Sequence, residues 1–219
     1  MHFSVIESCE QRFSRLTSKA VVSMDEAIGL AGALGRRIAD MTPPADLVVG
    51  LANGGILPAV VAAKEAGLPC EIVRVRRLSS RMKRMVEPLR HLLRFRILKE
   101  TFRPAKNLGL ELGRKANRVK VDADLSFDPR DRHVVIVDDC VDSGISVRRV
   151  RRLLTDRGAA SVRVAVLCWT TKFDSQALNA VTPDIHLHRL LHTYPWALNS
   201  PEYSGFKRWL RQSGVSSWR

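Results

Sequence analysis

The 219-residue sequence lacks any apolar run of 18 residues, and its first residues do not form a basic stretch that leads into a long apolar one. We therefore expect neither a transmembrane helix nor a signal peptide. The four cysteines (Cys9, Cys70, Cys140 and Cys168) are scattered and form no C-x-x-C pair. This spacing favours reduced thiols in a cytoplasmic protein over a disulfide framework.

Acidic side chains are scarce in one segment only. Residues 74–120 hold 16 basic residues and three acidic ones, a net charge of +13 out of +14 for the whole chain. The rest of the chain is nearly neutral, so the basicity belongs to this segment and not to the fold. The length and the globular composition predict one domain with insertions and a sizeable core.

Residues 133–146 organise the chain. An unbroken β-branched run at 134–137 is typical of a buried strand in a parallel sheet. Two acids, Asp138 and Asp139, follow where the carboxyl end of that strand should meet solvent. A short loop then opens into a helix with one apolar face over residues 147–154. The loop contains one acid and three small residues: Asp142, Ser143, Gly144 and Ser146.

This order of elements predicts an anion site, because backbone N–H groups at a helix N-terminus bind phosphate and Gly144 lets the chain approach closely. The paired acids would repel a phosphate. They suit the hydroxyls of a ribose and a magnesium ion instead, so a sugar phosphate with metal-bound pyrophosphate satisfies every part. The alternative is an ordinary strand–turn–helix junction with a polar turn.

Residues 134–146 resemble the PRPP-binding motif of type I phosphoribosyltransferases, and the form Asp-Asp-x-x-Asp-Ser-Gly-x-Ser is similar to the 6-oxopurine branch of that family. The resemblance implies that Asp139 also binds Mg²⁺ and that Asp142 acts as acid or base toward N7 of the base. Asp142 could instead cap the next helix. The implied PRPP-binding residues here are Asp138, Asp139, Cys140, Val141, Ser143, Gly144, Ile145 and Ser146.

A second strand–glycine–helix junction lies upstream, with a short buried strand at 46–51 and a helix that ends near Gly67. Within the resemblance, Asn53, Gly54 and Gly55 form the loop that meets pyrophosphate. Asn53 stands where a basic residue is common, so pyrophosphate must be neutralised elsewhere. The other interpretation of these three residues is a simple turn.

The C-terminal third resembles the hood of xanthine–guanine phosphoribosyltransferase. Tyr194 and Trp196 would form a platform that stacks on the base, and the alternative is that Trp196 packs in the core. After an expected strand at 161–168, Lys172 is the candidate ligand of an exocyclic oxygen, or an exposed loop lysine. It lies two residues later than in 6-oxopurine enzymes, where Thr170 stands.

The chain is therefore expected to adopt the α/β, type I phosphoribosyltransferase fold, a central parallel sheet flanked by helices, with a C-terminal hood and a basic helical insert. Ser23 and Glu26 form a capping-box pattern at the start of a first helix. The expected units are an N-terminal extension at 1–45, a phosphoribosyltransferase domain at 46–202, its insert at about 77–130, its hood at about 169–202, and a C-terminal helix and tail at 203–219.

The resemblance implies an Mg²⁺-dependent enzyme that transfers ribose 5-phosphate from PRPP to a nitrogenous base, most simply a 6-oxopurine, and releases pyrophosphate. We also expect a homo-oligomer. The basic segment 74–120 could be a solvated face, a flap that supplies cations to the substrate, or a surface for nucleic acid or anionic membrane. The alternative function is a nucleotide-sensing regulator of the same fold that binds nucleic acid through this segment.

Overall fold

The computed structural model describes residues 11–77 apart from Ser14 and Thr17, residues 119–121, residues 125–170 apart from Ser143, and residues 181–215. The strands are β1 (Leu47–Ala52), β2 (Cys70–Arg77), β3 (Val119–Val121), β4 (His133–Val141), β5 (Ser161–Trp169) and β6 (Ile185–His188). The helices are α2 (Met24–Ala39), α3 (Ile56–Ala66), α6 (Ile145–Asp156) and α7 (Tyr203–Gln212).

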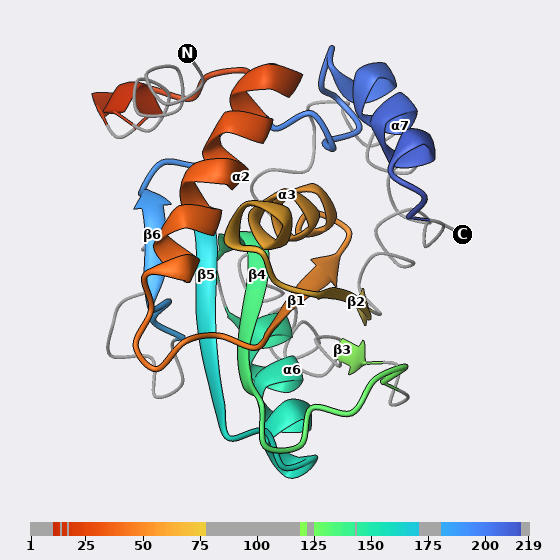
Figure 1. The fold of residues 1–219 in the computed structure, drawn as a ribbon. Coiled ribbons are helices and arrows are strands. Elements are labelled where there is room, and N and C mark those ends of the chain that lie inside the picture. Colours follow the sequence, from red (N-terminus) through yellow and green to blue (C-terminus); the bar gives the residue numbers. More distant parts are fainter. Residues whose placement is uncertain are drawn as a thin grey trace, which may run out of the picture.

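The described strands form one six-stranded sheet in the order β3-β2-β1-β4-β5-β6. Strands β2, β1, β4, β5 and β6 run parallel, and β3 pairs antiparallel with the edge of β2. Helices α2 and α3 cover one face of the sheet and α6 covers the other (Figure 1). This arrangement confirms the expected parallel sheet flanked by helices.

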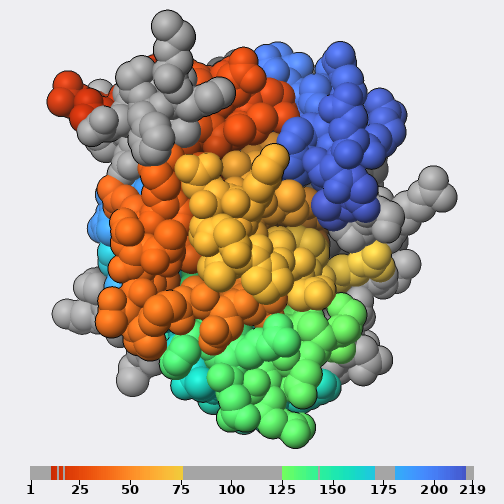
Figure 2. Space-filling model, viewed as in Figure 1, coloured from red at the N-terminus to blue at the C-terminus, as the bar shows by residue number. Residues whose placement is uncertain are grey.

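Two apolar cores form because the buried strands carry branched side chains on both faces. On one face, α2 and α3 pack against Val48, Val135 and Leu167. On the other face, Val150 and Leu154 of α6 pack against strand residues that alternate with the first set. Figure 2 shows the molecule from the side of α2 and α3. On this side the surface of α3 lies between that of α2 and that of the C-terminal segment.

The predicted start of the first helix is confirmed in detail. Ser23 is the N-cap of α2, its side-chain oxygen accepts from the Glu26 N–H at 3.2 Å, and the Glu26 carboxylate accepts from the Ser23 N–H at 2.9 Å. The strand predicted at 134–137 extends to Val141, because β4 stays paired with β5 as far as Val141 and Trp169. The two acids therefore belong to strand β4 and do not follow its end.

Most of the basic segment, residues 78–118, lies outside the described residues, so its expected helices and its role stay predictions. None of the helices in the described part of the chain combines the length and the apolarity that crossing a bilayer requires.

Candidate functional site

The candidate site lies at the carboxyl ends of β1 and β4. These two strands are parallel neighbours, with Leu47 opposite Val134 and Gly50 opposite Val137. Because they end at the same edge of the sheet, the glycine loop after β1 meets the acidic pair of β4. The structure thus brings together the two junctions that the sequence singled out, although they are about 85 residues apart along the chain.

The contact between the junctions is too close to admit a side chain at Gly54 or Gly55 without a shift of the neighbouring atoms. A β-carbon at Gly54 would lie 2.2 Å from Oδ2 of Asp139. At Gly55 it would lie 2.6 Å from the backbone oxygen of Val137 and 3.0 Å from the α-carbon of Asp138. Both glycines are therefore required for the approach of the loop to the strand. Asn53, the residue before them, is exposed, and the peptide bond that precedes it is cis.

The acids of β4 are partly buried. The Asp138 carboxylate accepts a hydrogen bond from the backbone N–H of Asp139 at 2.9 Å. The Asp139 carboxylate accepts one from Nε1 of Trp196 at 2.6 Å. This second bond joins the acidic pair to a segment 57 residues later in the chain. No sequence pattern indicates it beyond the presence of a tryptophan in the C-terminal third.

Helix α6 begins beside these acids. Its N-cap is Gly144, whose φ of +66° is the left-handed conformation that glycine adopts readily. Among the described residues no side chain caps this helix, so the N–H groups of its first turn are candidate donors to an anion. Val181 also packs close to Gly144. A β-carbon at residue 144 would lie 2.8 Å from the β-carbon of Val181.

Asp142 does not cap α6. Its side chain is exposed, and Oδ1 accepts a hydrogen bond from the Thr170 hydroxyl at 3.0 Å. Thr170 is buried at the carboxyl end of β5, where its N–H also donates to the Val141 carbonyl at 3.1 Å. Thr170 thus holds the candidate acid or base from the neighbouring strand. The sequence placed this threonine correctly but assigned it no role.

The remaining residues of the β4–α6 junction differ in exposure. Val141 and Ser146 are buried, while Cys140 and Ile145 are partly exposed. Ser143 and the base-binding candidate Lys172 lie outside the described residues, so both assignments stay predictions.

Cys140 has a sulfur neighbour across the sheet. It is the register partner of Cys168 on β5, and its sulfur lies 3.9 Å from the Thr170 hydroxyl oxygen. A hydrogen bond from the Cys168 thiol is the main cause that lowers the pKa of Cys140, and the same bond raises the pKa of Cys168. The more acidic thiol is therefore the one beside the acidic pair.

Tyr194 and Trp196, the expected base platform, are both buried, with 2% and 9% of their surfaces exposed. Their rings stack on each other with centroids 4.8 Å apart, and the edge of Phe206 meets Trp196 at 6.0 Å. The Tyr194 hydroxyl bonds to Nε2 of His188 at 2.9 Å. The base-stacking role stays a prediction, and each of the two rings already stacks one of its faces on the other.

The donor set at the site suits a magnesium ion that takes most of its ligands from a substrate. Among the described residues no group of three or more His, Cys, Asp or Glu side chains could hold a metal ion. Asp138 and Asp139 offer adjacent carboxylates, and Mg²⁺ is commonly bound by one or two carboxylates together with substrate phosphates and water. The pair therefore fits Mg²⁺ that enters with a phosphorylated ligand.

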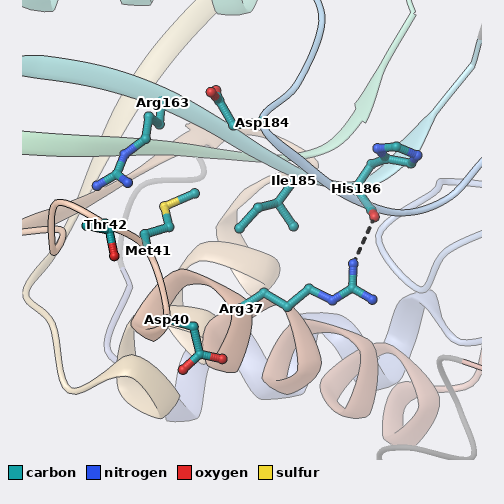
Figure 3. A pocket seen from close by; sticks show the side chains of 8 residues that line it. All are labelled: Arg37, Asp40, Met41, Thr42, Arg163, Asp184, Ile185 and His186. Carbon is teal, nitrogen blue, oxygen red and sulfur yellow. Dashed lines mark hydrogen bonds between the residues drawn. The ribbon is translucent and has the colours of Figure 1, made fainter.

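A separate pocket of about 510 Å³ lies at the opposite end of the sheet. It is lined by the last turn of α2, with Arg37 and Asp40, and by the first residues of β5 and β6, with Arg163 and Ile185. Figure 3 shows Arg37 crossing it to reach the backbone oxygen of His186 at 3.4 Å. This pocket lies at the amino ends of the strands, away from the glycine loop and the acidic pair.

A comparison with protein families finds a match. The model of the phosphoribosyl transferase domain matches residues 23–182 of the chain. This range contains both strand–glycine–helix junctions. A comparison with curated proteins finds no match.

Solved structures share the fold at low identity. A purine phosphoribosyltransferase from Pyrococcus horikoshii matches with a TM-score of 0.56 and 20% identity, over 81% of this chain and 93% of that one. The xanthine-guanine-hypoxanthine phosphoribosyltransferase of Helicobacter pylori matches with a TM-score of 0.55 and 13% identity, over 87% and 99%. A hypothetical protein from Neisseria gonorrhoeae with bound ppGpp gives 0.54 and 17%, over 91% and 99%. Likeness at these identities shows the fold alone, and the fold expected from the sequence is confirmed.

Proposed function

Because the chain belongs to the phosphoribosyltransferase family, as the match over residues 23–182 shows, we propose that it transfers ribose 5-phosphate from PRPP to a purine base of the 6-oxopurine type. The family match makes it a pentosyltransferase of the phosphoribosyl class. The purine acceptor is supported by the form of the β4–α6 motif and by the purine phosphoribosyltransferases among the structural neighbours.

The observation that carries the proposal is the closure of Gly54 onto Asp139, which sets a loop of backbone amides against two carboxylates at one edge of the sheet. Such an arrangement can hold the two unlike ends of one substrate. The first-turn N–H groups of α6 would bind the 5′-phosphate, the carboxylates of Asp138 and Asp139 would take the ribose hydroxyls, and the loop of Asn53 would face pyrophosphate.

In the transfer, a nitrogen of the base forms a bond to the anomeric carbon of the ribose as the bond from that carbon to the pyrophosphate oxygen breaks. Asp142 would accept a proton from the base, or donate one to it, as this bond forms. The hydrogen bond from Thr170 would hold the Asp142 carboxylate in one orientation for this step. Asp139 would help to hold Mg²⁺, which would supply positive charge for the departing pyrophosphate, because the side chain of Asn53 carries none.

Release of pyrophosphate from PRPP, measured over a panel of bases with Mg²⁺ present, tests this proposal. We expect release that depends on a 6-oxopurine and exceeds release with adenine or orotate. Release that depends on another base would identify that base as the acceptor and would leave the proposed reaction unchanged. Absence of base-dependent release over the whole panel would contradict the proposal, whether or not calorimetry detects PRPP binding.

A second function is favoured by one observation. The pyrophosphate loop carries the exposed and uncharged Asn53 instead of a cation, which suits a protein that binds a nucleotide without turnover. A structural neighbour from Neisseria gonorrhoeae was solved with bound ppGpp. A nucleotide-sensing regulator would bind nucleic acid through residues 74–120, with a steep dependence on salt in a filter-binding titration. That partner, the homo-oligomer and the cytoplasmic location stay predictions.

A further inference from the structure

Trp196 makes a polar contact with the acidic pair that a base platform would not need. Its Nε1 donates to Oδ2 of Asp139 at 2.6 Å, which is short for an N–H···O bond and is typical of a charged acceptor. An indole offers one donor and no acceptor, so it can pair only with an oxygen that accepts. The contact therefore orients the Asp139 carboxyl group.

The indole is held on several sides, so the direction of its N–H is fixed by packing. Tyr194 stacks on it at an angle of 10°, and Phe206 of α7 meets it at 62°. Tyr194 is in turn anchored by His188, whose Nε2 accepts from the tyrosine hydroxyl and whose Nδ1 donates to the backbone oxygen of Leu190 at 3.0 Å. A series of contacts thus runs from the core of the β6 region to the carboxylate of Asp139.

The same carboxylate also meets Gly54, where a β-carbon would lie 2.2 Å from Oδ2, the oxygen that accepts from Trp196. The position of Oδ2 is therefore limited by a fixed donor and by the backbone of the Gly54 loop. A carboxylate that must meet a sugar hydroxyl or a metal ion acts only when its lone pairs are aimed, and neighbouring groups that aim such ligands change affinity about ten- to a hundred-fold.

We propose that Trp196 is a positioning residue for Asp139 and acts on the sugar and metal side of the reaction, not on the base. The inference rests on the proposed function for the role of Asp139, and it differs from the stacking role that the family resemblance suggests for Trp196. The two roles make opposite kinetic predictions, because a stacking ring governs the KM of the base and a positioning donor governs the use of PRPP and Mg²⁺.

Trp196→Phe tests the proposal, since it keeps an aromatic ring and removes the N–H donor. Loss of a hydrogen bond to a charged group should raise the KM for PRPP and the Mg²⁺ concentration for half-maximal rate about ten-fold or more. The KM of the base should stay within about two-fold. Trp209→Phe is the matched control, because Trp209 is a second tryptophan in contact with the ring of Phe206, with centroids 6.3 Å apart, and it should change none of these values. A rise confined to the KM of the base would overturn the proposal.

A spectroscopic readout separates this proposal from the proposed function. The chain has four tryptophans, and the indole N–H signal of Trp196 is identified by its loss in Trp196→Phe. Asp139→Asn should move that signal upfield, because an amide oxygen carries less charge than a carboxylate, and should leave the Trp209 signal in place. An unmoved Trp196 signal would refute the contact. If the wild-type protein showed no turnover, the proposed function would fail alone, and PRPP affinity measured by calorimetry on the same variants would still decide the positioning role.

Discussion

Gly54 and Asp139 are in contact across the site, and a β-carbon on residue 54 would lie 2.2 Å from Oδ2 and 2.4 Å from the carboxyl carbon of Asp139. The glycine therefore defines where the carboxylate can be. Because the crowded atoms are the end of a side chain and not backbone, a methyl group at this position should displace the acid without unfolding the protein.

We predict that Gly54→Ala lowers kcat/KM for PRPP at least about ten-fold, by analogy with the loss of groups that orient a ligand-binding carboxylate, with little change in melting temperature. Gly67→Ala is the control, since Gly67 ends α3 at a φ of +68° with no atom within 4 Å of its β-carbon position. That variant should lose about 1 kcal/mol of stability, the typical cost of the left-handed conformation, and keep its activity. Equal activity of the two variants would show that the contact with Asp139 is not part of the site.

The assignment of Asp142 as acid or base leads to a second prediction. Asp142→Asn keeps the size of the side chain and its hydrogen bond from Thr170 but removes the capacity to exchange a proton. Turnover should fall about a hundred-fold, the usual scale of general acid–base catalysis, while PRPP affinity stays within a few-fold. Asp156→Asn, at the exposed end of α6, should have no effect. Equal losses in turnover and PRPP affinity would contradict the assigned role.

The sequence predicted the parts of this structure that depend on local chemistry. The capping box of α2 and the strand–glycine–helix junctions are visible because each is built from adjacent residues with strong preferences. The end of a strand cannot be predicted from adjacent residues in the same way. β4 extends beyond its apolar run because β5 stays paired with it up to Val141 and Trp169, and a pairing partner cannot be read from the strand itself.

The site could be predicted in kind but not in its cross-chain contacts. The family resemblance assigns both loops to PRPP, so it predicts that they lie near each other. The bond from Trp196 to Asp139 and the bond from Thr170 to Asp142 join residues 57 and 28 positions apart. Neither spacing follows a helix or strand period, so no pattern in the sequence could indicate them.

The paired thiols of β4 and β5 give a third prediction. The hydrogen bond from Cys168 lowers the pKa of Cys140, whereas burial raises the pKa of Cys70 to about 12. Because the thiolate is the reactive form, iodoacetamide at pH 8 should label Cys140 at least about ten-fold faster than Cys70, as measured by peptide mass mapping. Cys168→Ala removes the donor and should slow the labelling of Cys140. Faster labelling of Cys70 would contradict the arrangement of the two sulfurs.

The buried histidines of the hood give the last prediction, which concerns stability and pH. Burial is the main cause that lowers the pKa of His188 to about 4, and it also lowers the pKa of His192. Below pH 6.5 the unfolded chain binds protons that the folded protein excludes, so stability is complete above that pH and is lost as the pH falls toward 4. For His188 alone the loss between pH 7.5 and pH 5 should be about 2 kcal/mol. Urea unfolding at both pH values measures this loss. The variant His188→Gln, whose side chain cannot titrate, should lose correspondingly less stability. An equal loss in both proteins would show that His188 binds its proton in the folded state as readily as in the unfolded chain.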